Sequence, residues 1–217
     1  YKSLYPGKEY TIKGTLMDKR SGKAILDNGK EVTAEKTFKA EKENGFVELE
    51  FTFNASALKG ETIVVFEKLY EDGKELAIHT DINDVDQSIF VPRVKTSASF
   101  DDGNKNAKPS EKMTVTDVFS FKNLIKGQKY ILKGELVDKA TGKAIAKAEK
   151  EFTARSVDGD VKLDFAFDGS KYKDGAELVV TEKLYSLYSG KEKIVASHID
   201  LADLNQTVNI PAIKTTA

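Results

Sequence analysis

Cysteine is absent from this chain of 217 residues. Its absence excludes disulfides and thiolate metal sites, although it does not define the cellular compartment. An excess of charge is absent too, because 34 basic residues balance 35 acidic residues without forming a basic block. We therefore expect neither a nucleic-acid-binding surface nor a membrane-binding face.

Long apolar runs and targeting signals are also lacking. Apolar stretches are short, such as IVVF at residues 63–66, and none approaches the length of a membrane span. No secretory leader is recognisable at Tyr1 and no sorting signal at Ala217. These absences predict either a cytosolic protein or a segment of a longer one.

What the chain does contain is an internal repeat. The matching segments are 1–10 with 121–130, 12–25 with 132–145, 44–53 with 158–167, and 64–70 with 179–185. The last pair, for example, reads VVFEKLY and VVTEKLY. Because the offset between the copies varies only between 114 and 120 residues, we predict two homologous domains, each large enough to bury a core.

The pattern within each copy predicts β-structure. Val47, Leu49, Phe51 and Phe53 alternate with polar residues, and 161–167 alternate in the same way, which is the period of a half-buried strand. Turn signals separate the apolar runs at short intervals, and helical periodicity of useful length is missing. We expect an all-β chain of two tandem immunoglobulin-like (CnaB-like) β-sandwich domains.

The two copies differ in completeness. Tyr1 aligns with Phe121, so the first copy has no counterpart of residues 96–120. We therefore predict three parts: a repeat at 1–93 that lacks its first strands, a complete repeat at 94–213, and at 214–217 the stub of a following repeat.

Alternation along the predicted strands also indicates which polar side chains face the core, since residues two apart share a face. Five polar residues share a face with apolar neighbours: Thr96, Asp117, Glu182, His198 and Gln206. For Thr96 the neighbours are Val94 and Ala98, which leaves Ser97 outside. For His198 they are Ala196 and Ile194.

This set of inward polar residues is costly for a core that serves only stability. Each buried carboxylate costs several kcal/mol to desolvate, about the stability of a small domain, unless it is paired, protonated or hydrogen-bonded. The set does have a chemical use, because it combines a hydroxyl nucleophile, an amide electrophile and acid and base groups. The sequence thus predicts that Gln206 is a reactant and that His198 assists it.

Three motifs carry a family resemblance across essentially the whole chain. They are YxLxGxLxDKxTGK, the VVFE of residues 64–67, and H-x-D-x-x-D-x-x-Q followed by proline near the end of each copy. Together they resemble the VaFE repeat, or Thr-Gln ester bond domain, of Gram-positive cell-surface adhesins. The second copy departs from the pattern with VVTE, where Thr181 points outward.

The resemblance implies an intramolecular ester formed with loss of ammonia. By motif position, Thr96 is the nucleophile, Gln206 the acceptor, and Asp117, Glu182 and His198 the assisting groups. Because two carboxylates in a dry site do not both ionise readily, we expect Glu182 to be protonated and to polarise the Gln206 carbonyl. Asp117 and His198 would then accept the Thr96 proton, although exchanging the two acids fits the sequence equally well.

In the first copy the resemblance leaves the site incomplete. Glu67, His79 and Gln87 occupy the motif positions, but no residue of this copy can act as Thr96 does, so Gln87 is an acceptor without a partner. Thr215 aligns with Thr96 and is predicted to be the nucleophile of a following repeat. We expect the first repeat to be open, less stable, and able to accept a peptide that supplies the missing strands.

The function implied is that of a structural stalk in an adhesin at the cell surface, anchored to the cell wall. We expect no cofactor, no metal and no enzymatic turnover. The expected partners are neighbouring repeats, with a host ligand bound by another domain and no membrane insertion in this segment. The alternatives are a ligand-binding module, a Lys-Asn isopeptide-type stalk domain and, with Asp117 and Glu182 as its carboxylates, a glycosidase.

Overall fold

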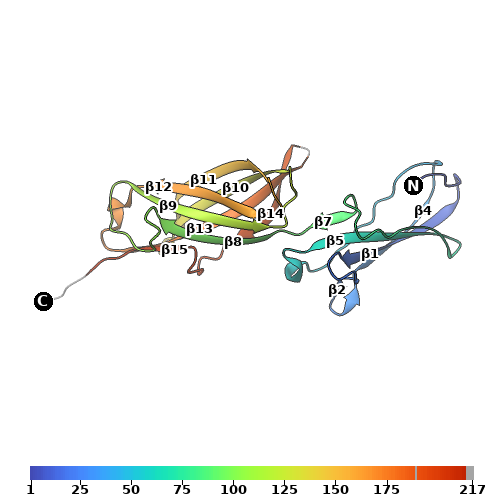
Figure 1. Cartoon of the computed structure of the whole chain (residues 1–217), viewed down its shortest axis with the longest axis horizontal. Coiled ribbons are helices and arrows are strands. Elements are labelled where there is room, and N and C mark those ends of the chain that lie inside the picture. The colour runs from blue at the N-terminus through green and yellow to red at the C-terminus, as the bar shows by residue number, and fades with distance from the viewer. Residues whose placement is uncertain (189, 214–217) are drawn as a thin grey trace. The chain divides into compact units, whose positions relative to one another are not determined.

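A computed structural model describes residues 1–188 and 190–213 of the chain. The backbone divides into two compact units, Tyr1–Val91 (unit 1) and Pro92–Ala217 (unit 2). Their strands are labelled in Figure 1. In the described residues, no helix is both long enough and apolar enough to cross a bilayer.

Unit 2 is a sandwich of two antiparallel sheets. Its strands are β8 (Arg93–Phe100), β9 (Met113–Lys122), β10 (Lys129–Asp138), β11 (Lys143–Thr153), β12 (Gly159–Phe167), β13 (Ala176–Tyr188), β14 (Lys191–His198) and β15 (Thr207–Ile210), with a short 3-10 helix, η2, at Gly169–Tyr172. One sheet has the order β12-β9-β8, and the other has the order β11-β10-β13-β14 with β15 also paired to β13 (Figure 1). The expected all-β sandwich is confirmed for this unit.

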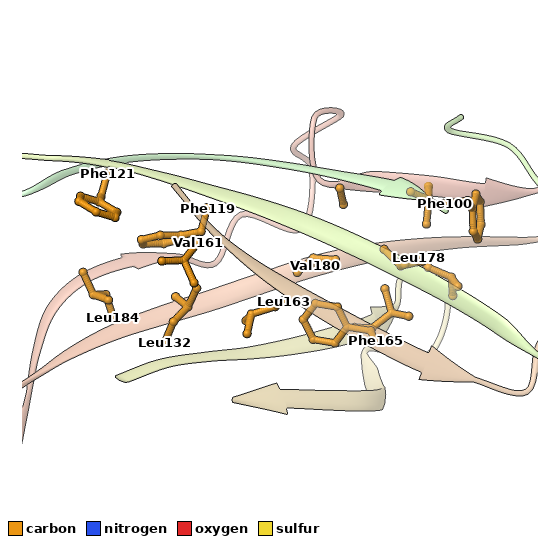
Figure 2. Close-up of a cluster of buried hydrophobic side chains, with 14 of the residues drawn as sticks. Phe100, Phe119, Phe121, Leu132, Val161, Leu163, Phe165, Leu178, Val180 and Leu184 are labelled. Carbon is orange, nitrogen blue, oxygen red and sulfur yellow. The ribbon is translucent and has the colours of Figure 1, made fainter. Parts of the chain in front are cut away.

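The core of unit 2 follows from the alternation of its strands. Along β9 every second residue is buried, so that Val115, Phe119 and Phe121 face the opposite sheet. Val161 pairs with Phe119 in the β9-β12 ladder. Figure 2 shows the side chains of Phe119, Phe121 and Val161 across the core from Leu132 and Leu184 of the other sheet, all within one continuous buried cluster. Burial of this apolar surface is the main force that holds the two sheets together.

Unit 1 retains only the larger of the two sheets. Its strands are β1 (Glu9–Asp18), β2 (Leu26–Asp27), β3 (Lys30–Glu31), β4 (Thr33–Lys39), β5 (Thr62–Glu71), β6 (Lys74–His79) and β7 (Ser88–Phe90), with a short 3-10 helix, η1, at Ser56–Leu58. The sheet order is β4-β1-β5-β6, β7 also pairs with β5, and β2 and β3 form a small hairpin. Its buried apolar residues form two small clusters.

The expected strand at 47–53 in unit 1 is wrong. These residues alternate between half-buried and exposed but belong to no strand. Their counterpart β12 is a strand because it pairs with β9, and unit 1 has no counterpart of β9. Without a neighbouring strand the backbone has no ladder to join. The side chains still keep their places, because a Cβ added at Gly14 would meet Phe51 and Leu49, as one at Gly134 would meet Phe165 and Leu163.

The prediction that Ile194 faces the core is also wrong. In the pairing of β13 with β14, Leu184 lies opposite Ala196 and the next residue, Tyr185, lies opposite Ile194. Val195 therefore has no partner in β13 and forms a β-bulge. The bulge turns Ile194 outward, where it is 52% exposed. His198 lies beyond the bulge and remains half-buried.

Candidate crosslinking site

A short segment before β15 connects the two sheets of unit 2. The amide of Ala98 in β8 donates to Asn205 O at 3.0 Å, and the amide of Val180 in β13 donates to Gln206 O at 3.0 Å. Two successive carbonyls therefore bond to strands of opposite sheets. This arrangement holds the Gln206 side chain in the space between the sheets, where it is fully buried.

The strands β8 and β9 contribute a hydroxyl and a carboxyl group to the same space. Thr96 is buried on β8, whereas the neighbouring Ser97 is exposed, as the alternation predicts. Asp117 lies opposite Ala98 in the β8-β9 ladder and is fully buried. Burial raises the pKa of the Asp117 carboxyl, against the favourable interactions with Glu182 and Gln206.

Glu182 of β13 contacts the amide of Gln206 directly. Gln206 Nε2 donates to Glu182 Oε1 at 2.8 Å, and the Glu182 side chain is only 1% exposed. Burial and the nearby Asp117 raise the pKa of Glu182 from its usual 4.5 to about 10. Glu182 therefore retains a proton at neutral pH, and Asp117 is the more acidic member of the pair.

The contact of Glu182 differs in one respect from the sequence-based expectation. We expected Glu182 to polarise the Gln206 carbonyl, but the hydrogen bond found involves the amide nitrogen. This nitrogen is the atom that would leave as ammonia. A protonated carboxyl beside it is suited to protonating a leaving group.

His198 has a partner that the sequence analysis missed. Its Nε2 lies 2.8 Å from Asp203 Oδ2, at ion-pair distance although off the direction of a hydrogen bond. The other carboxylate oxygen of Asp203 accepts the Asn205 amide at 2.7 Å, which fixes the orientation of the side chain. The signal was present, since Asp203 is the second aspartate of the H-x-D-x-x-D-x-x-Q motif.

Six buried polar atoms of this site have no hydrogen-bond partner among residues 1–188 and 190–213. They are Thr96 Oγ1, both Asp117 carboxylate oxygens, Glu182 Oε2, His198 Nε2 and Gln206 Oε1. Each unsatisfied buried group costs about 1–3 kcal/mol, so that the set would be hard to retain for stability alone. Unpaired groups concentrated at one place indicate a reaction centre.

Lys105 connects β8, which carries Thr96, with the segment before β15 that carries Gln206, and the sequence-based prediction missed it too. Its Nζ donates to the Asn205 carbonyl at 2.5 Å and also to the Ala98 carbonyl. Burial lowers the pKa of the Lys105 ammonium, and the charges of Asp203 and Asp117 oppose this shift. The residue thus places a cation beside the two acidic groups.

Unit 1 contains the same constellation in part. Glu67 lies opposite His79 in the β5-β6 ladder, as Glu182 lies opposite His198 in β13-β14. His79 Nε2 is 2.7 Å from Asp84 Oδ2, and Gln87 Nε2 is 3.4 Å from His79 Nδ1. The chain brings together every predicted residue of this half-site.

Two further sequence-based expectations concern Thr215 and the absence of a metal site. Thr215, the predicted nucleophile of a following repeat, falls outside the described residues. Within the described residues, no group of three or more acidic or histidine side chains is arranged to hold a metal ion.

A buried hydroxyl, a buried amide and two buried carboxyl groups lie between the sheets of one β-sandwich. Together they define a class of small domain with the groups needed for an internal crosslink. The particular family follows from the sequence: the chain belongs to the T-Q ester bond containing domain family, whose profile matches residues 1–91 and again residues 92–210. No curated protein sequence matches the chain.

A solved structure with a TM-score just above 0.5 supports the fold. An adhesin from Mobiluncus mulieris, described as containing intramolecular disulfide, isopeptide and ester bond cross-links, is similar in two crystal forms. The first is 19% identical with a TM-score of 0.51 and covers 56% of this chain and 57% of that chain. The second is 22% identical with a TM-score of 0.49 and the same coverage. The chain thus spans just over half the length of those structures.

Proposed function

We propose that unit 2 forms an ester between Thr96 and Gln206, and that the chain is part of the stalk of a bacterial surface adhesin. The observation that carries this proposal is the buried set of unpaired polar groups around the Gln206 amide. Family membership supports it, because both units match the ester bond domain profile.

The reaction balances within the site. Thr96 Oγ attacks Gln206 Cδ, the new C–O bond forms, and the C–N bond breaks to release ammonia. The hydroxyl proton passes to Asp117 or to His198, and Glu182 protonates the departing nitrogen with which it is already in contact. Because the fold holds both reactants in place, their effective concentration is high enough for an otherwise inert amide to react.

The chemistry proposed is a single event and not enzymatic turnover. Both reactants are consumed when the ester forms, and no group in the proposal regenerates them. The ester closes 111 residues, from Thr96 to Gln206, into one loop. By analogy with a disulfide, this would stabilise unit 2 by about 4–5 kcal/mol.

A stalk role follows from the positions of the crosslink. Thr96 lies in the first strand of unit 2, and Gln206 directly precedes the last, so that tension applied to the two ends would pass through a covalent bond. We place the parent protein at the cell surface, anchored to the cell wall, with neighbouring repeats as partners and a host ligand bound by another domain. The similar Mobiluncus structures, which are those of an adhesin, support this location.

Intact mass of the whole chain tests the proposal. We expect a deficit of one ammonia, assigned by fragmentation to a link between Thr96 and Gln206. Hydroxylamine applied to the unfolded protein should cut the link, freeing the Thr96 hydroxyl and leaving a hydroxamate on the side chain of residue 206, because it cleaves an ester and leaves a Lys-Asn isopeptide intact. A folded sample with the unmodified mass would contradict the proposal.

A further inference from the structure

One buried polar residue of unit 2 has no part in the proposed reaction. In the part of the chain that the structure describes, the buried polar and charged side chains are Thr96, Asp117, Glu182, Gln206 and Thr207. The first four belong to the crosslinking site, whereas Thr207 is the residue after the acceptor and is 5% exposed. Because burying a hydroxyl is costly unless it is hydrogen-bonded, its partner indicates what the side chain does.

The Thr207 hydroxyl closes the turn that carries Gln206. Thr207 Oγ1 donates to Asp203 O at 2.8 Å. The backbone bonds across the same turn are long: the Gln206 amide donates to Asp203 O at 3.2 Å, and the Thr207 amide donates to Leu204 O at 3.4 Å. Since such N–H···O bonds weaken beyond about 3.2 Å, the hydroxyl strengthens a turn whose own backbone bonds are weak.

Asp203 connects this turn to an assisting group of the reaction. Its Oδ2 lies 2.8 Å from His198 Nε2, while its carbonyl accepts the Thr207 hydroxyl. Thr207 directly follows Gln206 in the chain. The contacts from His198 through Asp203 to Thr207 therefore hold the histidine ring and the acceptor residue at a set separation.

Unit 1 makes the same contact with a different residue. Ser88 Oγ donates to Asp84 O at 2.6 Å, and Asp84 Oδ2 is 2.7 Å from His79 Nε2. Gln87 Nε2 lies 3.4 Å from His79 Nδ1, although His79 is exposed. Because serine and threonine share the hydroxyl and not the methyl group, the hydroxyl is the part of the side chain common to both turns.

The remaining contacts of the turn in unit 2 act on its main chain. The carbonyl of Asn205 accepts a bond from β8, and the carbonyl of Gln206 accepts one from β13. These bonds hold the backbone between the two sheets. The bond from Thr207 differs from them, because it ties the acceptor residue to Asp203 and hence to His198.

We propose that Thr207 is a positioning residue for the crosslinking reaction: its hydrogen bond to the Asp203 carbonyl holds the Gln206 amide in place beside His198. This inference rests on the proposed function and adds to it a residue that makes no covalent bond. The hydroxyl of Thr207 keeps its proton throughout. Its effect is on the fraction of time for which the amide lies where Thr96 can attack it.

Intact mass of refolding whole-chain variants tests this inference. Thr207→Val leaves the Asp203 carbonyl with the Gln206 amide as donor, so unit 2 should still fold. We expect ammonia loss to be about tenfold slower in Thr207→Val and in the smaller Thr207→Ala, and within about twofold of the unmodified chain in Thr207→Ser. The matched control is Ser170→Ala, which removes a hydroxyl bond to Asp168 in η2 and should leave the rate unchanged.

Hydrogen exchange of the Gln206 side chain, measured by NMR, tests the position of the amide without the reaction. In the uncrosslinked Thr96→Val chain, Gln206 Nε2 is held by Glu182 Oε1. Adding Thr207→Val should raise the exchange rate of this amide about tenfold through local opening, whereas adding Thr207→Ser should not. Because no ester is needed, this measurement tests Thr207 whether or not the crosslink forms.

Several results would overturn the proposal. Ammonia loss as fast in Thr207→Val as in the unmodified chain, even with a lower stability in urea, would reduce the hydroxyl to a structural contact. Slow ammonia loss in Thr207→Ser would show that the hydroxyl is not the part that matters, and unchanged exchange of the Gln206 amide would show that it is positioned by other contacts. A folded, unmodified chain without the ammonia deficit would instead reject the proposed function.

Discussion

Units 1 and 2 contain the same Glu, His, Asp and Gln at matching positions, with the same Glu-His strand pairing and His-Asp contact. The glutamine amide contacts Glu182 in unit 2 but His79 in unit 1, and only unit 2 encloses the group. Glu67 and Gln87 are half-buried and His79 is exposed, whereas Glu182 and Gln206 are at most 1% exposed. The difference lies in the second sheet, which unit 1 lacks. One sheet is therefore enough to bring the Glu, His, Asp and Gln together. The second sheet is needed to bury them away from water.

The grouping of Glu, His and Asp within one sheet has a simple physical origin. In both units, a Glu and a His face each other across one strand pair, and an Asp five residues after the His closes a turn with its carboxylate. Asp84 accepts the Asp86 amide at 2.8 Å, as Asp203 accepts the Asn205 amide at 2.7 Å. The pKa of Asp84 is lowered, first by this backbone hydrogen bond and also by His79. Such contacts form without a closed core.

The largest predicted effect is loss of the crosslink itself. Thr96→Val removes the nucleophile while preserving the shape of the side chain, so the chain should show no ammonia deficit. Unit 2 should lose about 4–5 kcal/mol of unfolding free energy through the greater entropy of the unfolded loop. Urea unfolding of unit 2 should then move toward that of unit 1. An unchanged midpoint would show that the bond does not stabilise the unit.

The second prediction is that Glu182 and its counterpart Glu67 differ in their effect on ammonia loss. Glu182→Gln keeps the size and hydrogen-bonding capacity of the side chain but removes its proton-donating carboxyl, and should slow ammonia loss by about 100-fold or more. The matched change Glu67→Gln should leave the mass of the isolated chain unaffected. Time-resolved intact mass after refolding measures both. Complete ammonia loss in Glu182→Gln would mean that another group is the acid.

The third prediction is a pH dependence that follows from burial. In the uncrosslinked Thr96→Val chain, folded Glu182 has a pKa of about 10 instead of 4.5, so the folded state binds the proton more tightly. The stability of unit 2 should be greatest below about pH 4.5 and should fall as pH rises toward 10, with Asp117 acting in the same direction. Adding Glu182→Gln should flatten much of the slope in urea titrations. An equally steep slope in the double variant would exclude Glu182 as its source.

The smallest predicted effect concerns Lys105, which unit 1 does not match. Lys105→Met removes a cation that joins the Ala98 and Asn205 carbonyls, and the loss of alignment should slow crosslinking about tenfold. Lys105→Arg should recover much of the rate because it keeps the charge and the donors. Refolding followed by mass at several pH values tests this. Equal rates in all three chains would limit Lys105 to a structural contact.

The sequence predicted some parts of the site better than others, for physical reasons. Thr96, Asp117 and Glu182 lie on strands whose alternation is unbroken around them, so their inward direction could be read directly. Ile194 could not be placed, because a single extra residue reverses the faces beyond it.

Other features depended on contacts that have no period in the sequence. The role of Asp203 arises from a turn that brings it to His198. The missing strand at 47–53 arises from the absence of a pairing partner, which alternation alone does not report. The contact of Asp203 and the missing strand are both visible when the structures of the two repeats are compared.

Complete burial of Gln206 and Asp117 also sets how long the proposed bond would last. The acids that help ammonia leave could equally help water attack, since hydrolysis passes through the same carbonyl carbon. The enclosed site excludes that water, so hydrolysis would have to wait for transient opening of the sandwich. The chemical lifetime of the ester would then be governed by the opening rate of the fold, and a stalk held under tension would age fastest where its sheets separate most often.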